Sequence, residues 1–294
     1  MKEKIHFFDA MDANKRNSYL LMGVMFLLVL GVLLAASYIM TDSLICFPFA
    51  LIGSLVYVFL TYNYGMNIVL SLSNAKPVTR STHPYLFQIV EGLCIASHIP
   101  MQKLYVIPEE SPNAFATGKD PEHSAIVVTQ GLLNTLDKRE LSAVIAHEIS
   151  HIGNYDIKYM TVTVVMVGLI AIIGRILLRS MIFGGSGGNR KGGGPFLVIA
   201  LVFVILAPIV ATLVRFALSR QKEFLADANS ARLTRDPKAL IGALKKISEK
   251  KMPVKAASDV TAPLYFSDPM IGKFSGIFAT HPPVQKRIDR LNQL

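Results

Sequence analysis

Long apolar stretches without charged side chains are the feature that most restricts how this chain can fold. Residues 17–41 carry no charge, and Tyr19–Met40 is almost wholly apolar, long enough to cross about 30 Å of hydrocarbon. A cleaved signal peptide is the alternative here, but this run exceeds the ~7–15 apolar residues usual in such peptides. Further apolar stretches lie within Leu44–Leu72, Met160–Phe183 and Pro195–Arg215. The sequence therefore predicts four transmembrane helices.

Composition supports a membrane location and argues against nucleic acid as a partner. Of the 294 residues, 52% are hydrophobic and 17% charged, against ~25% charged in soluble globular chains. The formal net charge is +10, and residues 215–294 alone hold 15 basic and 7 acidic side chains. Basic residues beside apolar spans are typical of a cytoplasmic membrane face. The chain has no Trp and no interleaved aromatic–basic pattern of the kind that binds nucleic acid.

Four spans place the remaining segments on one side of the membrane. Residues 1–18, 73–159 and 216–294 then share a side, and their excess of Lys and Arg places it in the cytoplasm. The Gly-rich loop over residues 184–194 lies opposite and, being basic, runs against this rule. We therefore expect a multi-pass protein that contacts membrane lipid and whose soluble segments are cytoplasmic.

Two arginines interrupt the third apolar stretch. Arg175 and Arg179 have no acidic residue in either late stretch to pair with, and an arginine near mid-span costs at least ~2.5 kcal/mol. Two explanations stay open: the side chains extend toward the Gly-rich loop, or they line a polar face between helices. Pro208 is expected to kink the fourth helix.

The soluble segments show the patterns of a mixed α/β domain. An amphipathic helix is predicted over Pro84–Ser97, and short strands are predicted over Lys103–Pro108, Asn113–Gly118 and Ser124–Val128. Cys46 and Cys94 lie in different kinds of segment, which argues against a disulfide and against a cysteine-based zinc site.

Helix starts are marked by capping residues. Asp137 with Glu140 three residues on predicts a capping box for a helix that ends near Gly153. Asp236-Pro237 predicts another helix start, and a short amphipathic helix is predicted near the chain end. The expected fold class is α+β, with four transmembrane helices and a mainly helical domain that contains a small β-sheet.

The chain divides into four segments on this interpretation. Residues 1–76 form an N-terminal segment with two transmembrane helices, and residues 77–159 form the first half of the soluble domain. Residues 160–215 hold two further hydrophobic helices joined by the Gly-rich loop, and residues 216–294 form the second half of the domain.

His147-Glu148-Ile-Ser-His151 is the motif that carries chemistry. The two histidines are one turn apart on the predicted helix, so both imidazoles reach one ion at ~2.0–2.1 Å. Glu148 lies about 100° round the helix, where it reaches a metal-bound water as general base for amide hydrolysis. A chance His-x-x-x-His is the alternative. It is disfavoured because the preceding apolar turns, with Leu141 and Val144, would bury two unpaired histidines.

Two histidines leave a third protein ligand to find. The other histidines are isolated, whereas Glu223 lies at the foot of the fourth apolar stretch, which two membrane passes bring back beside the His147 helix. Asp227, one turn on, is placed to accept a ring N–H from a ligand histidine. A solvated acidic face is the alternative for this pair. Two His and a carboxylate suit several divalent metals, so Zn²⁺, one per chain, is an inference.

The chain resembles the HtpX-type heat-shock membrane proteases, gluzincins related to the CAAX prenyl protease. The matching elements stand in order: Ser111–Gly118, the His147–His151 motif with Gly153-Asn154, Ser219–Asp227 and Thr280–Pro283. With the four hydrophobic stretches, the resemblance extends over nearly the whole chain. The ordered set is far more specific than His-Glu-x-x-His alone.

The resemblance implies a zincin-like catalytic domain at the plasma (inner) membrane, facing the cytoplasm. His147, His151 and Glu223 would be the zinc ligands, and Glu148 would be the base. Such a protein is expected to act in the stress response as a membrane quality-control protease.

Three further roles rest on the resemblance alone. Asn113–Phe115, including Ala114, resembles the edge strand that holds the substrate backbone by strand addition. His281 would stabilise the oxyanion, with a surface helix-capping role as the alternative. Arg220 would brace the site through an ion pair with a carboxylate such as Asp227.

The expected function is quality control of misfolded or damaged membrane proteins by a zinc endopeptidase. Unfolded or misassembled membrane proteins are the expected substrates, and other membrane quality-control proteases are candidate partners. Two alternatives are a CAAX-type protease for prenyl proteins, which needs a large intramembrane chamber, and a non-enzymatic metal-binding membrane module. The second should carry ionisable residues inside its spans, where this chain has only two arginines.

Overall fold

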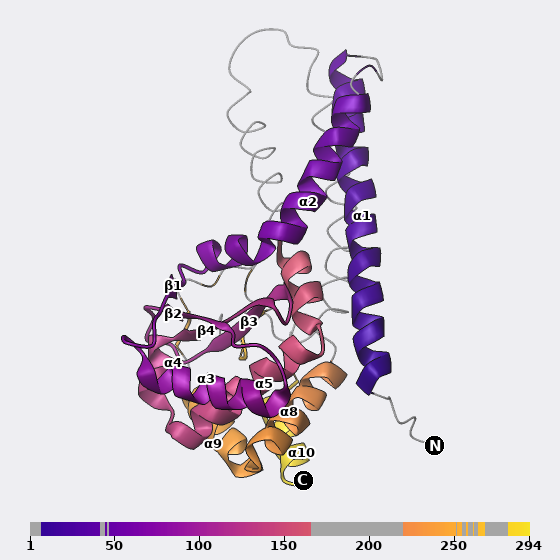
Figure 1. Cartoon of the computed structure of the whole chain (residues 1–294). Coiled ribbons are helices and arrows are strands. Elements are labelled where there is room, and N and C mark those ends of the chain that lie inside the picture. The colour runs from indigo at the N-terminus through magenta and orange to yellow at the C-terminus, as the bar shows by residue number, and fades with distance from the viewer. Residues whose placement is uncertain are drawn as a thin grey trace.

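Two long helices rise side by side from a body that holds a small sheet and shorter helices, as Figure 1 shows for the computed structural model. The structure describes residues 7–41, 45, 47–165, 220–250, 252–254, 257, 261, 264–267 and 282–294. The long pair consists of α1 (Phe7–Thr41) and α2 (Phe47–Leu72), which pack against each other.

α1 begins well before the apolar stretch that was predicted to span a membrane. Tyr19–Met40 lies inside this helix, and the polar residues 7–18 continue the same helix toward the body. Asn14 and Ser18 are buried there, and Asn14 Nδ2 donates a hydrogen bond to the backbone oxygen of Asn154 at 2.9 Å. The polar start of the helix therefore fastens α1 to the body.

α2 is the one helix within the described ranges that is long and apolar enough to cross a membrane. Its large apolar side chains point outward, with exposed fractions of 75% for Phe49, 58% for Ile52 and 61% for Phe59. Such a surface is unusual for a helix bathed in water, because contiguous exposed apolar patches mark interaction or membrane surfaces.

The third and fourth predicted spans lie mostly outside the described residues. The chain is helical over residues 156–165, and the start of the third stretch at Met160 is buried against the body. Residues 166–219 lie outside the description, and with them Arg175, Arg179, the Gly-rich loop and Pro208. Of the four predicted spans, the described structure supports one clear candidate.

The body contains a four-stranded mixed sheet. Its strands are β1 (Lys76–Pro77), β2 (Lys103–Ile107), β3 (Ala114–Asp120) and β4 (His123–Thr129), in the order β1-β2-β4-β3. β2 and β4 run parallel, and the other two pairs are antiparallel. The three predicted strands are confirmed to within two residues at each end. β1 was missed because two residues carry no periodicity.

β4 lies between β2 and β3 in the sheet, and its run Ala125–Val128 is buried on both faces. β3 is an edge strand, and it meets β4 through a tight connection in which Gly118 adopts φ 148° against the backbone of His123 and Ser124. A side chain at Gly118 would clash there. The edge strand lies beside the helix that carries the predicted metal site.

The described residues contain six further labelled helices in the body: α3 (Pro84–Ser97), α4 (Gln130–Thr135), α5 (Lys138–Gly153), α8 (Arg220–Thr234), α9 (Pro237–Glu249) and α10 (Val284–Leu291). The helices predicted at the positions of α3, α5, α9 and α10 are confirmed, whereas α4 was not predicted. α5 is buried on nearly all sides, between α3, β3, α8 and α9. A helix that is enclosed in this way holds its side chains rigidly.

The start of α5 is fixed by the capping box that the sequence predicted. The side chain of Asp137 accepts from the amide of Glu140 at 2.9 Å, and Glu140 accepts from the amide of Asp137 at 3.0 Å. Lys246 Nζ also donates to Glu140 at 2.6 Å and ties α9 to the same turn. α5, which carries His147 and His151, is thus anchored at its N-terminal end, away from these histidines.

Replacing Asp137 with Ala should weaken the fold measurably. The variant leaves the amide of Glu140 without its acceptor, and loss of an N-cap side chain usually costs about 1 kcal/mol. Denaturation of the detergent-solubilised protein, followed by circular dichroism, measures this decrease in the free energy of unfolding. Lys138→Ala, one residue on and exposed, is the control. Equal stability of Asp137→Ala and wild type would contradict a stabilising cap.

Candidate metal centre

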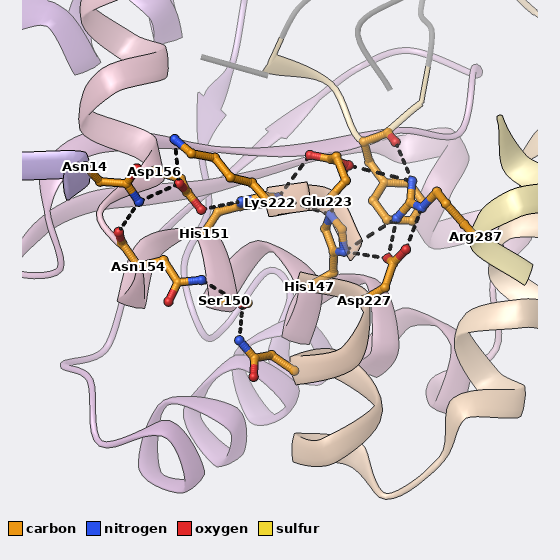
Figure 2. Close-up of polar contacts among 12 residues, drawn as sticks. Asn14, His147, Ser150, His151, Asn154, Asp156, Lys222, Glu223, Asp227 and Arg287 are labelled. Carbon is orange, nitrogen blue, oxygen red and sulfur yellow. Dashed lines mark hydrogen bonds and ion pairs between the residues drawn. The ribbon is translucent and has the colours of Figure 1, made fainter. Parts of the chain in front are cut away.

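α5 presents His147 and His151 on one face, one turn apart, as Figure 2 shows. Both residues are buried, with 1% and 5% of their surface exposed, and their Nε2 atoms lie 3.2 Å apart. The His-x-x-x-His spacing thus produces the convergence that was predicted from helix geometry.

α8 supplies the third side chain. Glu223 Oε1 lies 3.4 Å from His151 Nε2, and Glu223 Oε2 lies 3.7 Å from His147 Nε2. One ligand atom from each of the three residues fits within 4.8 Å of the others. α8 is held against α5 by a hydrogen bond from Ser230 Oγ to the backbone oxygen of Ala143 at 2.6 Å. Two segments far apart in sequence therefore build one site.

The donor set fits a zinc ion. His147 Nδ1 lies 3.0 Å from Asp227, and His151 Nδ1 lies 3.1 Å from Asp156, so each Nδ1 carries a proton and donates a hydrogen bond to a carboxylate. When both rings are neutral, as metal binding requires, each Nε2 turns a lone pair toward the other ring and toward Glu223. Facing lone pairs repel unless a cation lies between them. Ligand atoms ~2.1 Å from a tetrahedral zinc are about 3.4 Å apart, close to the spacings here.

The two histidines sit in different electrostatic environments. Burial lowers the pKa of His147 to about 4, although Asp227 acts in the opposite direction, so its ring is neutral as a metal ligand requires. Burial also opposes protonation of His151, but hydrogen bonds to Asp156 and Glu223 outweigh it and raise its pKa well above the ordinary value. The pocket therefore favours a positive charge at the position where a metal would bind.

Asp156 contacts the ligand His151, and the sequence did not predict this role. Its Oδ2 holds His151, while its Oδ1 accepts from Asn14 Nδ2 at 2.8 Å and pairs with Lys222 Nζ at 3.0 Å. The side chain is almost wholly buried, and Figure 2 shows it between α1 and the ligand ring. The available signal was a carboxylate five residues after His151. Only the fold reveals that α1 contacts it.

Arg287 is the other residue that the sequence did not reveal. Its Nε and Nη2 atoms donate to the two oxygens of Asp227 at 2.9 and 2.6 Å, and only 1% of the residue is exposed. Burial alone would raise the pKa of Asp227, but Arg287 and His147 outweigh it and lower that pKa to about 2. This bidentate pair fixes the carboxylate behind the ligand ring.

This finding corrects the expectation that Arg220 pairs with Asp227. In the described structure the guanidinium bound to Asp227 is that of Arg287, and Arg220 is exposed at the start of α8. The two residues are seven positions apart on one helix, which separates them by roughly 10 Å along its axis. His281 lies outside the described residues, so its role at the oxyanion stays a prediction.

Glu148 lies in the same cavity as the three metal-site residues. It is 3% exposed, and the cavity also contains Ala116 of β3 together with Leu264 and Phe266. The space measures about 10 Å³, which is about the room that one water needs. A carboxylate, a metal site and an edge strand thus face one small enclosed volume.

The edge strand is partly covered by the chain itself. The amide of Phe266 donates to the backbone oxygen of Ala114 at 2.8 Å, and Asn113 Nδ2 donates to the oxygen of Ser267 at 3.0 Å. Since strand residues two apart face the same edge, the backbone of Ala116 also faces outward. Of the expected substrate strand Asn113–Phe115, only Ala114 presents its backbone to this edge, and it is already engaged.

A helix-borne His-x-x-x-His pair, a glutamate from a second helix and an adjacent edge strand define a zinc metallopeptidase. A model of peptidase family M48 matches residues 80–294, and the chain belongs to this family. His147, His151 and Glu223 form the zinc-ligand triad of these peptidases. The alternative of a non-enzymatic metal-binding module is thereby set aside.

Known relatives are similar in sequence to this chain over nearly its whole length. The chain is 45% identical over 293 residues to a "Protease HtpX homolog" of Dictyoglomus thermophilum, covering 98% of this chain and 95% of that one. A protein of the same name from Lactobacillus acidophilus is 42% identical over 298 residues, covering 96% and 97%. The crystal structure of S. mikatae Ste24p has a similar fold, with a TM-score of 0.52 and 18% identity over 97% of this chain and 67% of that chain.

Weakening the support behind His151 should weaken zinc binding. Asp156→Asn removes the charged acceptor, and loss of such a partner typically lowers metal affinity about 10–100-fold. Asn14→Ala removes a hydrogen bond to Asp156, which is not itself a metal ligand, and should give a smaller decrease in affinity. Competition with a chromogenic chelator measures both. The control is Asn229→Ala, whose amide contacts Ser150 Oγ at 2.9 Å instead of a ligand. Unchanged affinity in Asp156→Asn would remove Asp156 from the site.

Stability should fall on acidification as Asp227 becomes protonated. Its pKa in the folded chain is about 2, below the ordinary value of ~3.9, so its contribution is complete above about pH 5 and is lost as pH falls toward 2. We expect the difference in unfolding free energy between wild type and Asp227→Asn to be constant from about pH 5 to 7 and to shrink below about pH 4. Denaturation series across this range measure it, and a pH-independent difference contradicts the assignment.

Proposed function

We propose that this chain is a membrane-embedded zinc endopeptidase that degrades misfolded or damaged membrane proteins from the cytoplasmic side. The observation that carries the proposal is the meeting of Glu148, the zinc ligands and edge strand β3 in one buried cavity. Peptide-bond hydrolysis needs a base, an electrophilic metal site and a means of aligning the substrate backbone, and these three parts supply them.

Glu148 is the proposed general base. Zinc, when bound, supplies polarisation of the scissile carbonyl and lowers the pKa of a water to about 7. Glu148 takes a proton from the attacking water and passes it to the leaving amine. Burial keeps bulk water away from this carboxylate, so proton transfer is confined to the water in the cavity. With zinc bound, His147 and His151 would bind it through Nε2 as neutral rings, while Asp227 and Asp156 accept from Nδ1–H and fix the ring orientations.

The orientation of β3 supports substrate binding by strand addition. The backbone N–H and C=O of Ala116 face the strand edge away from β4, two residues from Ala114, whose oxygen accepts from the Phe266 amide. An enclosed volume of about 10 Å³ does not admit a peptide. A substrate therefore binds only after Leu264 and Phe266 move aside, and its own backbone then takes the place of the Phe266 amide.

The membrane location is supported by the surface of the long helices. α2 has the length and composition of a span, and its outward side chains are apolar. α1 runs beside it and contains the predicted span Tyr19–Met40. The excess of Lys and Arg in the segments around the site favours the cytoplasmic side.

The quality-control role is supported by the mode of capture. A site that binds backbone through an edge strand, with little side-chain selection, accepts any segment whose own hydrogen bonds are broken. Misfolded and unassembled proteins expose such segments. The relation to proteins named protease HtpX homologues supports the peptidase activity on which this role depends.

Glu148→Gln should abolish hydrolysis while leaving zinc bound. The amide cannot accept the proton, so cleavage of a loosely folded membrane protein by detergent-purified enzyme should fall by at least 10²-fold, as general-base loss usually gives. Zinc content should stay near that of wild type, because Glu148 is not one of the three ligands. Gel assays with zinc, with chelator and with the variant measure this. Activity that survives Glu148→Gln contradicts the mechanism.

Glu223→Ala provides the complementary result, with zinc content and activity lost together.

A prenylated peptide assayed in parallel separates the two substrate classes. Efficient cleavage of that peptide, with no cleavage of the unfolded membrane protein, would replace the quality-control proposal with prenyl-protein processing.

A further inference from the structure

A second cavity lies at the base of the long helices, apart from the metal centre. It measures about 190 Å³ and is bounded by the body-side part of α2, the β3–β4 connection and the helical segment 156–165. None of its lining residues belongs to the metal cavity. It lies where the exposed apolar surface of α2 gives way to the polar body.

The lining of this cavity is cationic. Lys103, Lys119 and Lys158 contribute to it, and among the described residues no Asp or Glu does. His123 also lines it but is bound to Asp120 at 2.8 Å. Within the described part of the chain, none of the three lysines forms an ion pair, although three like charges around one space repel one another. An anion in the cavity would relieve that repulsion.

The burial of Lys158 is the clearest indication that this cavity binds an anion. Only 5% of this residue is exposed, and its ammonium group contacts the rings of Tyr19 at 4.0 Å and Tyr62 at 5.2 Å. Lys119 lies 5.0 Å from the same Tyr62 ring. The Tyr19 side chain also forms a hydrogen bond with Lys158. Ring contacts and this neutral partner offset part of the cost of burying an ammonium ion, but a buried cation normally has a carboxylate or another anion as partner. No carboxylate within the described ranges takes that place.

We propose that this cavity binds the phosphate group of an anionic phospholipid. Its volume is below the ~300–1,000 Å³ of ordinary small-molecule pockets, which suits a headgroup better than a larger ligand. Ammonium groups and the side-chain amide of Asn67, which also lines it, are the donors that a phosphate diester requires. Basic pockets at the cytoplasmic end of membrane helices recognise such lipids.

The adjoining surface of α2 favours a lipid over free phosphate. Phe59 and Leu60, within a turn of the cavity residues Tyr62 and Asn63, are exposed to 61% and 44%. An acyl chain attached to a phosphate in the cavity lies against these side chains, whereas free phosphate leaves them uncovered. The inference rests on the proposed membrane insertion of α2.

The test uses the full chain in an uncharged detergent. Phosphatidylglycerol should raise the Tm in a saturable manner, while phosphatidylcholine and inorganic phosphate at equal concentration should give little or no shift. The double variant Lys103→Met/Lys119→Met should lower the apparent affinity for phosphatidylglycerol at least tenfold. Both positions lie outside the catalytic machinery, and Lys158→Met, which alters a buried residue, serves as a second variant.

Lys138→Met is the matched control. Lys138 also lies over a tyrosine ring, 5.6 Å from that of Tyr85, but lines no part of this cavity. Its affinity for phosphatidylglycerol should equal that of wild type. Equal affinity of the double variant and wild type overturns the proposal, and an equal shift with inorganic phosphate alone overturns the lipid in favour of a free anion.

A carbonate wash of membranes separates this inference from the proposed function. Wild type and the double variant should both stay in the membrane fraction. Release of both chains, with lysine-dependent binding of phosphatidylglycerol retained, contradicts membrane insertion and leaves the cavity assignment standing.

Discussion

The convergence of three electron-pair donors in a dry interior is the constraint on which the rest of the body depends. His147, His151 and Glu223 are each at most 5% exposed, and their ligand atoms fit within 4.8 Å. Without a cation such an arrangement is unfavourable, because desolvated lone pairs and a carboxylate face one another. The fold holds them together by packing α8 on α5, so metal affinity and folding are coupled in this chain.

Each ligand histidine is held by a carboxylate, and the two carboxylates connect the site to opposite ends of the chain. Asp227 is fixed by Arg287 of α10, and Asp156 by Asn14 of α1. Both carboxylates carry a cationic neighbour, so their charge is balanced where it cannot be hydrated. The metal centre is therefore a junction between the helix that leads into the proposed membrane region and the last helix of the body.

Local signals carried most of the correct predictions. The capping box at Asp137, the strands and the spacing of His147 and His151 depend on residues close in sequence, where helix and strand periodicity apply. Glu223 was reached by a topological argument, because two membrane passes return the chain to the same side. The contacts made by Asp156 and Arg287 were not predicted, since Asn14 and Asp156 are 142 residues apart and Arg287 and Asp227 are 60 apart.

The partial cover over edge strand β3 relates the geometry of the site to the kind of substrate that we propose. Phe266 already occupies the outward oxygen of Ala114, so the resting site offers chiefly the backbone of Ala116. A folded protein has its own strands paired and gains nothing by exchanging those hydrogen bonds for a short edge. In the proposed mechanism, an unfolded segment offers unpaired backbone that would replace the hydrogen bond of the Phe266 amide. Selection by backbone availability thus requires no recognition sequence, which is the property that a quality-control peptidase needs.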